Sequence, residues 1–177
     1  MKRRTEYCGL ISEKLVGQTV TLDGWVAKRR DHGGVIFIDL RDREGIMQVV
    51  FNPARNQEAF EIAEKLRSEY VIQVTGEVGY RGEGLENPNL KTGKYELLVD
   101  EVEVFSQAKT SPIYIDDEQK ASEELRLKYR YLDIRRRSVL ENLRLRHKTT
   151  KSIREYLDGE GYIDVETPIL AKSTPEG

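Results

Sequence analysis

Five segments rich in β-branched and aromatic residues fill most of the first hundred positions, and they constrain the fold more than any other feature. Turn-forming residues such as Gly, Asn and Asp separate them, a pattern that is typical of strands. The segments run from Val20 to Arg30, Val35 to Leu40, Ile46 to Phe51, Tyr70 to Arg81 and Tyr95 to Phe105. The sequence therefore predicts five strands in this part of the chain.

A single helix is predicted between the third and fourth strands. There Ala59, Ile62, Ala63 and Leu66 recur at the i, i+3, i+4, i+7 spacing that produces one apolar stripe. Three strands, a helix and two further strands is the element order of the OB fold, a five-stranded barrel. We therefore predict a mainly β chain with an OB barrel; a small β-sandwich is the alternative that fits the same pattern.

The composition changes after the fifth strand. Residues 108–137 combine a Pro-containing turn, an acidic patch and a dense basic run, which is typical of a hinge between domains. We predict three parts: an OB-fold domain over residues 1–107, a hinge over 108–137, and over 138–177 the start of a second domain whose core is unfinished.

The predicted second domain contains one helix and one strand. Ser138 and Glu141 have the spacing of a capping box at a helix start, and Gly159 and Gly161 mark its end. The segment YIDVETPIL that follows has the composition of a strand, which we predict to end near Pro168.

The overall charge gives no case for nucleic-acid binding, since 29 Lys and Arg face 31 Asp and Glu and the net charge is -2. Any such case must be local. A single cysteine, Cys8, excludes an internal disulfide and a thiolate zinc cluster, and with only His32 and His147 no metal site is expected. No membrane span or secretory signal is predicted, which fits a cytoplasmic protein.

The stretch WVAKRRDHGGVIFIDLRD supplies the local case. Its strand period of two puts Ile36, Ile38 and Leu40 on one face and Phe37 on the opposite, polar face. In an OB fold, strands two and three, with the loops joining strands one to two and four to five, bind oligonucleotides. An aromatic ring there can stack on an unpaired base, and the cations Lys28 to Arg30 can meet phosphates. The alternative is a phenylalanine at the barrel rim, covered by a loop.

Three parts of the sequence resemble the bacterial type of aspartyl-tRNA synthetase: GWVAKRRDHGGVIFIDLRDREGIMQVV, LRLKYRYLDIRRR, and GYIDVETPIL followed by STPEG. The resemblance runs from about Thr5 to the last residue, and the class II synthetases for lysine and asparagine share parts of it. It implies the N-terminal fragment of a homodimeric ligase that activates L-aspartate with ATP and Mg2+ and transfers it to tRNA(Asp). The fragment would hold the OB domain, the hinge and the first helix and strand of the α+β catalytic domain.

The resemblance also implies roles for five residues of the OB domain. Phe37 would stack on the middle anticodon base, with Arg30 and Gln48 beside it. Glu96 would meet the first base, and Arg81 would help to hold the RNA backbone.

Further along the chain, Pro168 matches the end of the first class II motif, which forms the dimer interface, and Glu176 matches a contact to the ammonium group of aspartate. The motifs that bind ATP and magnesium are absent from this sequence. We therefore predict that the chain alone has no catalytic residues, binds neither ATP nor Mg2+ and is inactive. A stand-alone tRNA-binding module without catalysis is the alternative.

Two positions resemble family members that charge two tRNAs. These are His32, followed by glycines in the first loop, and Gly84 in the loop between strands four and five. The resemblance implies a non-discriminating enzyme that makes Asp-tRNA on both tRNA(Asp) and tRNA(Asn), the second product passing to a tRNA-dependent amidotransferase. The alternatives are that both are ordinary turn residues, or that the enzyme is a discriminating aspartyl-, asparaginyl- or lysyl-tRNA synthetase.

Overall fold

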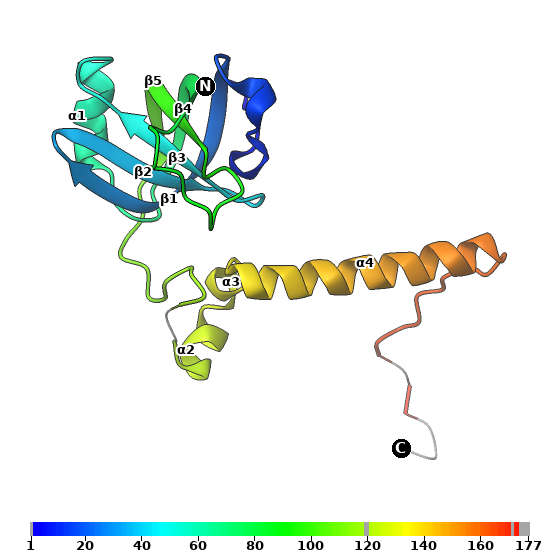
Figure 1. Cartoon of the computed structure of the whole chain (residues 1–177). Helices are drawn as coiled ribbons and strands as arrows, with labels where there is room; N and C mark the ends of the chain where they lie inside the picture. The colour runs from blue at the N-terminus through cyan, green and yellow to red at the C-terminus, as the bar shows by residue number, and fades with distance from the viewer. Residues whose placement is uncertain (1, 119–120, 171, 174–177) are drawn as a thin grey trace. The chain divides into compact units, whose positions relative to one another are not determined.

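The computed structural model describes residues 2–118, 121–170 and 172–173 (Figure 1). The chain divides into two units, Met1–Tyr114 and Ile115–Gly177. In chain order, the described elements of the first unit are η1 (Cys8–Leu10), η2 (Glu13–Leu15), β1 (Thr19–His32), β2 (Val35–Arg41), β3 (Ile46–Phe51), α1 (Gln57–Lys65), β4 (Val71–Tyr80) and β5 (Tyr95–Ser106). Those of the second unit are α2 (Glu123–Lys128), α3 (Arg130–Asp133) and α4 (Arg137–Gly159).

The strands form a closed barrel in the order β1-β2-β3-β5-β4. All neighbouring strands are antiparallel except β3 and β5, which are parallel. The long strand β1 closes the barrel because its first half pairs with β4 and its second half with β2. A register shift between Val26 and Lys28 interrupts the regular pairing of β1 with β2, and irregularities of this kind let a strand bend from one neighbour to the other. The predicted OB barrel is therefore confirmed, and the sandwich alternative is wrong.

The turn between β1 and β2 fixes the register of the hairpin. Gly33 and Gly34 have φ angles of 61° and 79°. Positive φ at both central residues is the geometry of a type I′ turn, which matches the twist of the flanking strands and favours glycine. The turn places His32 opposite Val35 and, further along the ladder, Arg30 opposite Phe37.

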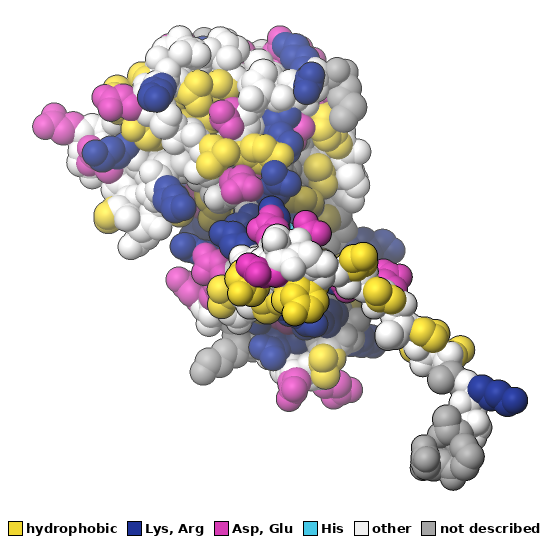
Figure 2. Space-filling model, turned by 90° about the vertical axis from the view of Figure 1, so that its right-hand side faces the viewer, with side chains coloured by type: hydrophobic (Ala, Val, Ile, Leu, Met, Phe, Trp, Pro, Cys, Tyr) yellow, Lys and Arg dark blue, Asp and Glu magenta, His cyan; other side chains and the backbone are white. Residues whose placement is uncertain are grey.

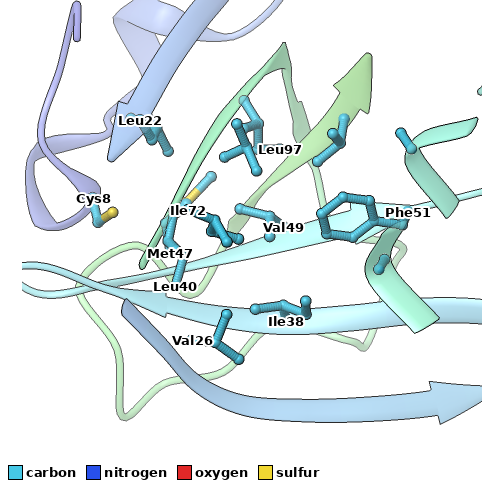
Figure 3. Close-up of a cluster of buried hydrophobic side chains, with 14 of the residues drawn as sticks. Cys8, Leu22, Val26, Ile38, Leu40, Met47, Val49, Phe51, Ile72 and Leu97 are labelled. Carbon is cyan, nitrogen blue, oxygen red and sulfur yellow. The ribbon is translucent and has the colours of Figure 1, made fainter. Parts of the chain in front are cut away.

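The core fills the barrel interior with apolar side chains from every strand and from η1 (Figure 3). On β2 the alternation is strict: Ile36, Ile38 and Leu40 are fully buried, whereas Phe37 and Asp39 are partly exposed. The two faces that the period of two predicted for this strand are therefore confirmed.

The helix α1 packs against β2, β3 and β5. It buries Ala59 and Ala63, and Leu66 is buried directly after its last turn. The Asn56 side chain caps its first turn by accepting a hydrogen bond from the backbone N–H of Ala59 at 3.0 Å. The predicted helix between the third and fourth strands is thus present.

The start of α4 differs from the expected capping box. The helix begins at Arg137, so Ser138 lies inside its first turn. The Ser138 hydroxyl and backbone N–H donate to the two carboxylate oxygens of Asp117, at 2.5 and 3.1 Å. A charged carboxylate is a stronger acceptor than a hydroxyl, and the helix dipole favours a negative charge at this end. A residue distant in sequence therefore takes the capping role.

The strand expected over YIDVETPIL is not formed. Residues 162–170 are irregular, and Ile163 and Ile169 are 86% and 100% exposed. A strand requires neighbouring backbone to bond with, and the described residues of the second unit contain no other strand. Figure 2 shows hydrophobic side chains at the surface of this segment after α4.

Within the described ranges, no helix is long and apolar enough to cross a bilayer.

Candidate nucleic-acid interface

The barrel brings the predicted anticodon residues to one side of the sheet. Arg30 on β1 lies directly opposite Phe37 on β2. Residues directly opposite one another in an antiparallel pair project to the same side. Gln48 on β3 lies directly opposite Asp39 of β2. Asp39 is two positions from Phe37, so Gln48 projects to the same side of the sheet as Phe37. We call this surface the polar face; its residues are Lys28, Arg30, Phe37, Asp39, Gln48, Arg81 and Glu96.

A chain of side-chain hydrogen bonds crosses the polar face. The Nη2 of Arg30 donates to Asp39 Oδ1 at 2.5 Å and to Gln48 Oε1 at 3.3 Å. The Nε2 of Gln48 then donates to Glu96 Oε2 at 2.9 Å. The chain therefore links four strands, β1, β2, β3 and β5. Gln48 is only 8% exposed, so its amide is held in one orientation by its two partners.

Arg81 follows the last residue of β4 and completes this surface. Its Nε donates to the Tyr95 carbonyl at 3.1 Å. Its Nη2 is buried, and no described group is its hydrogen-bond partner. Burial lowers the pKa of Arg81, while the nearby carboxylates of Asp39 and Glu96 act in the opposite direction. The folded chain thus leaves one buried donor of Arg81 without a described partner, which is uncommon and marks this surface for attention.

Both carboxylates of the polar face have perturbed pKa values. Burial raises the pKa of Asp39, although the cations Arg30, Arg81 and Lys28 oppose the shift. Burial likewise raises the pKa of Glu96, against the hydrogen bond from Gln48 and the charge of Arg81. Removing a carboxylate from water costs free energy that these partners only partly return. Perturbed groups gathered on one surface are typical of functional sites.

Phe37 offers an apolar ring beside this polar chain. Its side chain is partly exposed, and among the described residues it belongs neither to the core nor to the partly buried side chains packed against the core. The ring lies between Arg30 on β1 and Val50 on β3 in the strand register. A partly exposed ring on a face that also carries cations is a suitable surface for stacking a base.

Two loops border the sheet and carry the other predicted residues. His32 is the exposed last residue of β1. In the loop between β4 and β5, Gly84 has a φ of 76° and open space where a Cβ would project. The stem of that loop is fixed, because the hydroxyl of Thr92, only 1% exposed, donates to the Ile46 carbonyl at 2.5 Å. Neither His32 nor Gly84 belongs to the hydrogen-bond chain, and their proposed role stays a prediction.

Asp39 is the member of this surface to which sequence reasoning gave no role. The strand period placed it on the same face as Phe37, but its contact with Arg30 depends on the pairing of β1 with β2.

Of the remaining predicted residues, Pro168 lies in the exposed irregular segment and Glu176 lies outside the described residues. Within the described ranges, no group of three or more His, Cys, Asp or Glu residues could hold a metal ion.

Family models match both parts of the chain. Residues 20–105 match the OB-fold nucleic acid binding domain, and residues 122–177 match the class II tRNA synthetases of the D, K and N type. The first match includes all five strands of the barrel except the first residue of β1 and the last residue of β5.

Curated relatives are similar over the whole chain. An aspartate–tRNA ligase of Enterococcus faecalis is 56% identical over 177 residues, which is 100% of this chain and 30% of the relative. An aspartate–tRNA(Asp/Asn) ligase of Geobacillus is 58% identical over 174 residues, or 98% of this chain and 29% of the relative. The chain thus spans less than a third of the length of these relatives.

Solved structures of related synthetases have a similar fold. An asparaginyl-tRNA synthetase of Pyrococcus horikoshii superposes with a TM-score of 0.81 at 31% identity, covering 97% of this chain and 39% of the other. An aspartyl tRNA synthetase of Entamoeba histolytica gives 0.83 at 20% identity, covering 95% and 40%, a likeness that supports the fold alone.

Proposed function

Because this chain belongs to the bacterial aspartyl-tRNA synthetase family and carries its OB-fold anticodon-binding domain and the beginning of its class II domain, we propose that the polar face recognises the anticodon loop of tRNA(Asp). In this proposal the middle base stacks on Phe37 and its edge meets Arg30 and Gln48. The Glu96 carboxylate accepts a hydrogen bond from the first base, and Arg81 helps to hold the RNA backbone.

The single observation that carries the proposal is the hydrogen-bond chain from Arg30 through Gln48 to Glu96. These side chains already hold one another without RNA, so little side-chain ordering remains to be done on binding. The chain presents a donor, an amide and a carboxylate beside a ring, which are the groups that read the edges of unpaired bases.

A titration with RNA tests this function. A stem-loop with the tRNA(Asp) anticodon should bind this chain at least about tenfold more tightly than one with the same stem and an altered anticodon, since one well-placed base contact supplies about 1–3 kcal/mol. Equal affinities for the two stem-loops at matched ionic strength would contradict anticodon recognition. Electrostatic attraction between the protein and the RNA phosphates would then explain the binding.

For the whole enzyme we propose the family's reaction: activation of L-aspartate with ATP and Mg2+, then transfer to tRNA by a homodimer. The described residues offer no acidic cluster for magnesium, so no step of this reaction is assigned to them. We also propose that residues 108–137 act as a hinge between an OB domain over 1–107 and the class II part over 138–177.

This chain by itself should be inactive, because the residues that bind ATP are expected in other parts of the family's length. Aspartate-dependent exchange of pyrophosphate into ATP should remain at the level of a blank. Exchange above that level, from protein free of host synthetase, would contradict the assignment. The alternative of a tRNA-binding module that functions without catalysis predicts the same blank for this chain.

We further propose that the enzyme charges both tRNA(Asp) and tRNA(Asn). The Geobacillus relative is named for both tRNAs, whereas the Enterococcus relative is named for aspartate only. His32 and Gly84 belong to the two loops that border the polar face, where a contact to the third anticodon base would be made. Asp-tRNA(Asn) would then be the substrate of a tRNA-dependent amidotransferase.

A further inference from the structure

Asp39 is a negative charge within a surface that is proposed to bind a polyanion. Its side chain is 20% exposed, and it is surrounded by the cations Lys28, Arg30 and Arg81. Near RNA such a carboxylate repels phosphates, and in the folded protein its burial is unfavourable. Its presence therefore needs a function that is different from attraction of RNA.

The geometry indicates what that function is. Asp39 and Phe37 are two residues apart on the same face of β2, and Arg30 lies opposite Phe37 on β1. The 2.5 Å contact from Arg30 Nη2 to Asp39, together with the 3.3 Å contact to Gln48, draws the guanidinium across the sheet toward β3. An arginine side chain without such partners samples many rotamers and can follow the nearest phosphate.

We propose that Asp39 is a positioning residue that holds the Arg30 guanidinium next to Gln48, two positions along β2 from Phe37, so that Arg30 reads the edge of a base stacked on Phe37 and does not bind a phosphate. The Nη2 of Arg30 is engaged by Asp39 and Gln48, and no described residue accepts a hydrogen bond from its Nε or Nη1, so these donors can meet a base edge. Because Asp39 holds Arg30 in this position, the contact that Arg30 makes depends on which base is present and is no longer a general attraction to phosphate. This inference rests on the proposed anticodon recognition.

Loss of the Asp39 carboxylate should raise the affinity for RNA and lower the preference for the cognate middle base. Without the Asp39 carboxylate, Arg30 is free to neutralise one more phosphate, so total affinity for RNA should rise. The plot of log K against log salt concentration should become steeper by about 0.7, the contribution of one phosphate on a single strand. The preference for the cognate middle base should fall, because the donor is no longer held at its edge.

The experiment measures binding of four anticodon stem-loops that differ only in the middle base to this chain. In Asp39→Asn, which keeps the size of the side chain, and in Asp39→Ala, the preference for the cognate base should fall about tenfold, within the range that one base contact supplies. Asp100→Asn is the matched control. It removes a carboxylate that also pairs with an arginine, Arg55 at 2.6 Å, outside the polar face, and it should leave the base preference unchanged.

A double variant separates positioning from direct contact. In an Arg30→Gln background, Asp39→Asn should cause no further loss of base preference, because there is no guanidinium left to position. An equal loss in both backgrounds would mean that Asp39 contacts the base itself, and would overturn the inference. So would an unchanged preference in both single Asp39 variants. A wild-type chain that binds all four stem-loops equally would overturn the proposed anticodon recognition as well.

Discussion

At the scale of single residues, the geometry of the polar face depends on side chains whose orientation is fixed by hydrogen bonds to their neighbours. Gln48 illustrates this, because its oxygen accepts from Arg30 and its nitrogen donates to Glu96. Turning the amide over would place its NH2 group against a guanidinium and its oxygen against a carboxylate, so both bonds would be lost. One orientation is therefore selected before any RNA arrives, and that orientation decides which base edge fits.

Replacing Phe37 by Ala should weaken binding of the anticodon stem-loop by about 1–3 kcal/mol, the usual contribution of one stacked base. The melting temperature should change little, because the ring is not part of the core. Phe51, which is 1% exposed, provides the contrast, since its truncation should cost about 3–5 kcal/mol of fold stability. If Phe37→Ala lowers the melting temperature as much as Phe51→Ala does, the ring is structural and the stacking role is wrong.

Replacing Glu96 by Gln should stabilise the fold at neutral pH. Burial raises the pKa of Glu96 in the folded state above its unfolded value, so the folded state favours the protonated group, and the ionised carboxylate costs stability above that pKa. Gln keeps an acceptor for Gln48 without the charge. The stability difference between variant and wild type, measured by urea denaturation, should shrink as the pH falls from 7 to about 4, because wild-type Glu96 then becomes protonated. A difference that does not depend on pH would contradict the burial argument.

At the scale of elements, α1 shows how a short helix is fixed to the barrel. Asn56 caps its first turn and also donates from Nδ2 to the Asp100 carbonyl on β5 at 2.6 Å. The preceding residue, Arg55, pairs with Asp100 and Glu77 at 2.6 and 3.3 Å. A helix of 9 residues is marginal on its own, so these contacts and the burial of Ala59 and Ala63 hold it in place.

Substitutions at Asn56 should therefore destabilise the barrel in a graded way. Asn56→Ala should cost about 1–2 kcal/mol, since it removes both the cap and the donor to β5. Asn56→Ser should cost less, because its hydroxyl can still cap the helix although it cannot reach the Asp100 carbonyl. Asn89→Ala, in the exposed loop between β4 and β5, is the control and should have little effect in urea denaturation. Equal stability of the Ala and Ser variants would show that the cap contributes nothing.

At the scale of the whole molecule, the two units differ in how far they are packed. The barrel encloses a continuous core, whereas α4 buries none of its residues, and Ile169 and Leu170 after it are 100% and 89% exposed. Apolar surface of this extent is typical of a site of interaction with other protein surface. It is in keeping with the homodimer that we propose for the whole enzyme.

The whole enzyme should also show little preference between its two proposed tRNAs. We expect kcat/KM values for tRNA(Asp) and tRNA(Asn) to differ by less than about tenfold, since the loops that carry His32 and Gly84 would make no strong contact to the third base. His32→Leu should make the enzyme selective for tRNA(Asp), while His147→Leu, at an exposed position of α4, should leave the ratio unchanged. A preference of a hundredfold or more in the wild type, about 2.7 kcal/mol, would contradict non-discrimination.

The sequence by itself determined the elements of the barrel, because strand period, helical spacing and turn glycines are local properties. The predicted bounds of β3 agree with the structure, and the faces of β2 and the glycine turn before it follow from single stretches of chain. Only the tertiary structure decided the partners of the polar side chains. Gln48 meets Arg30 and Glu96 across 18 and 48 residues of sequence, because the strand order of the sheet places β1 and β5 on either side of β2 and β3. Dependence on partners distant in sequence also explains two predictions from local patterns that were wrong. The capping carboxylate of α4 comes from Asp117, 21 residues before Ser138, and YIDVETPIL finds no strand to pair with among the described residues of the second unit.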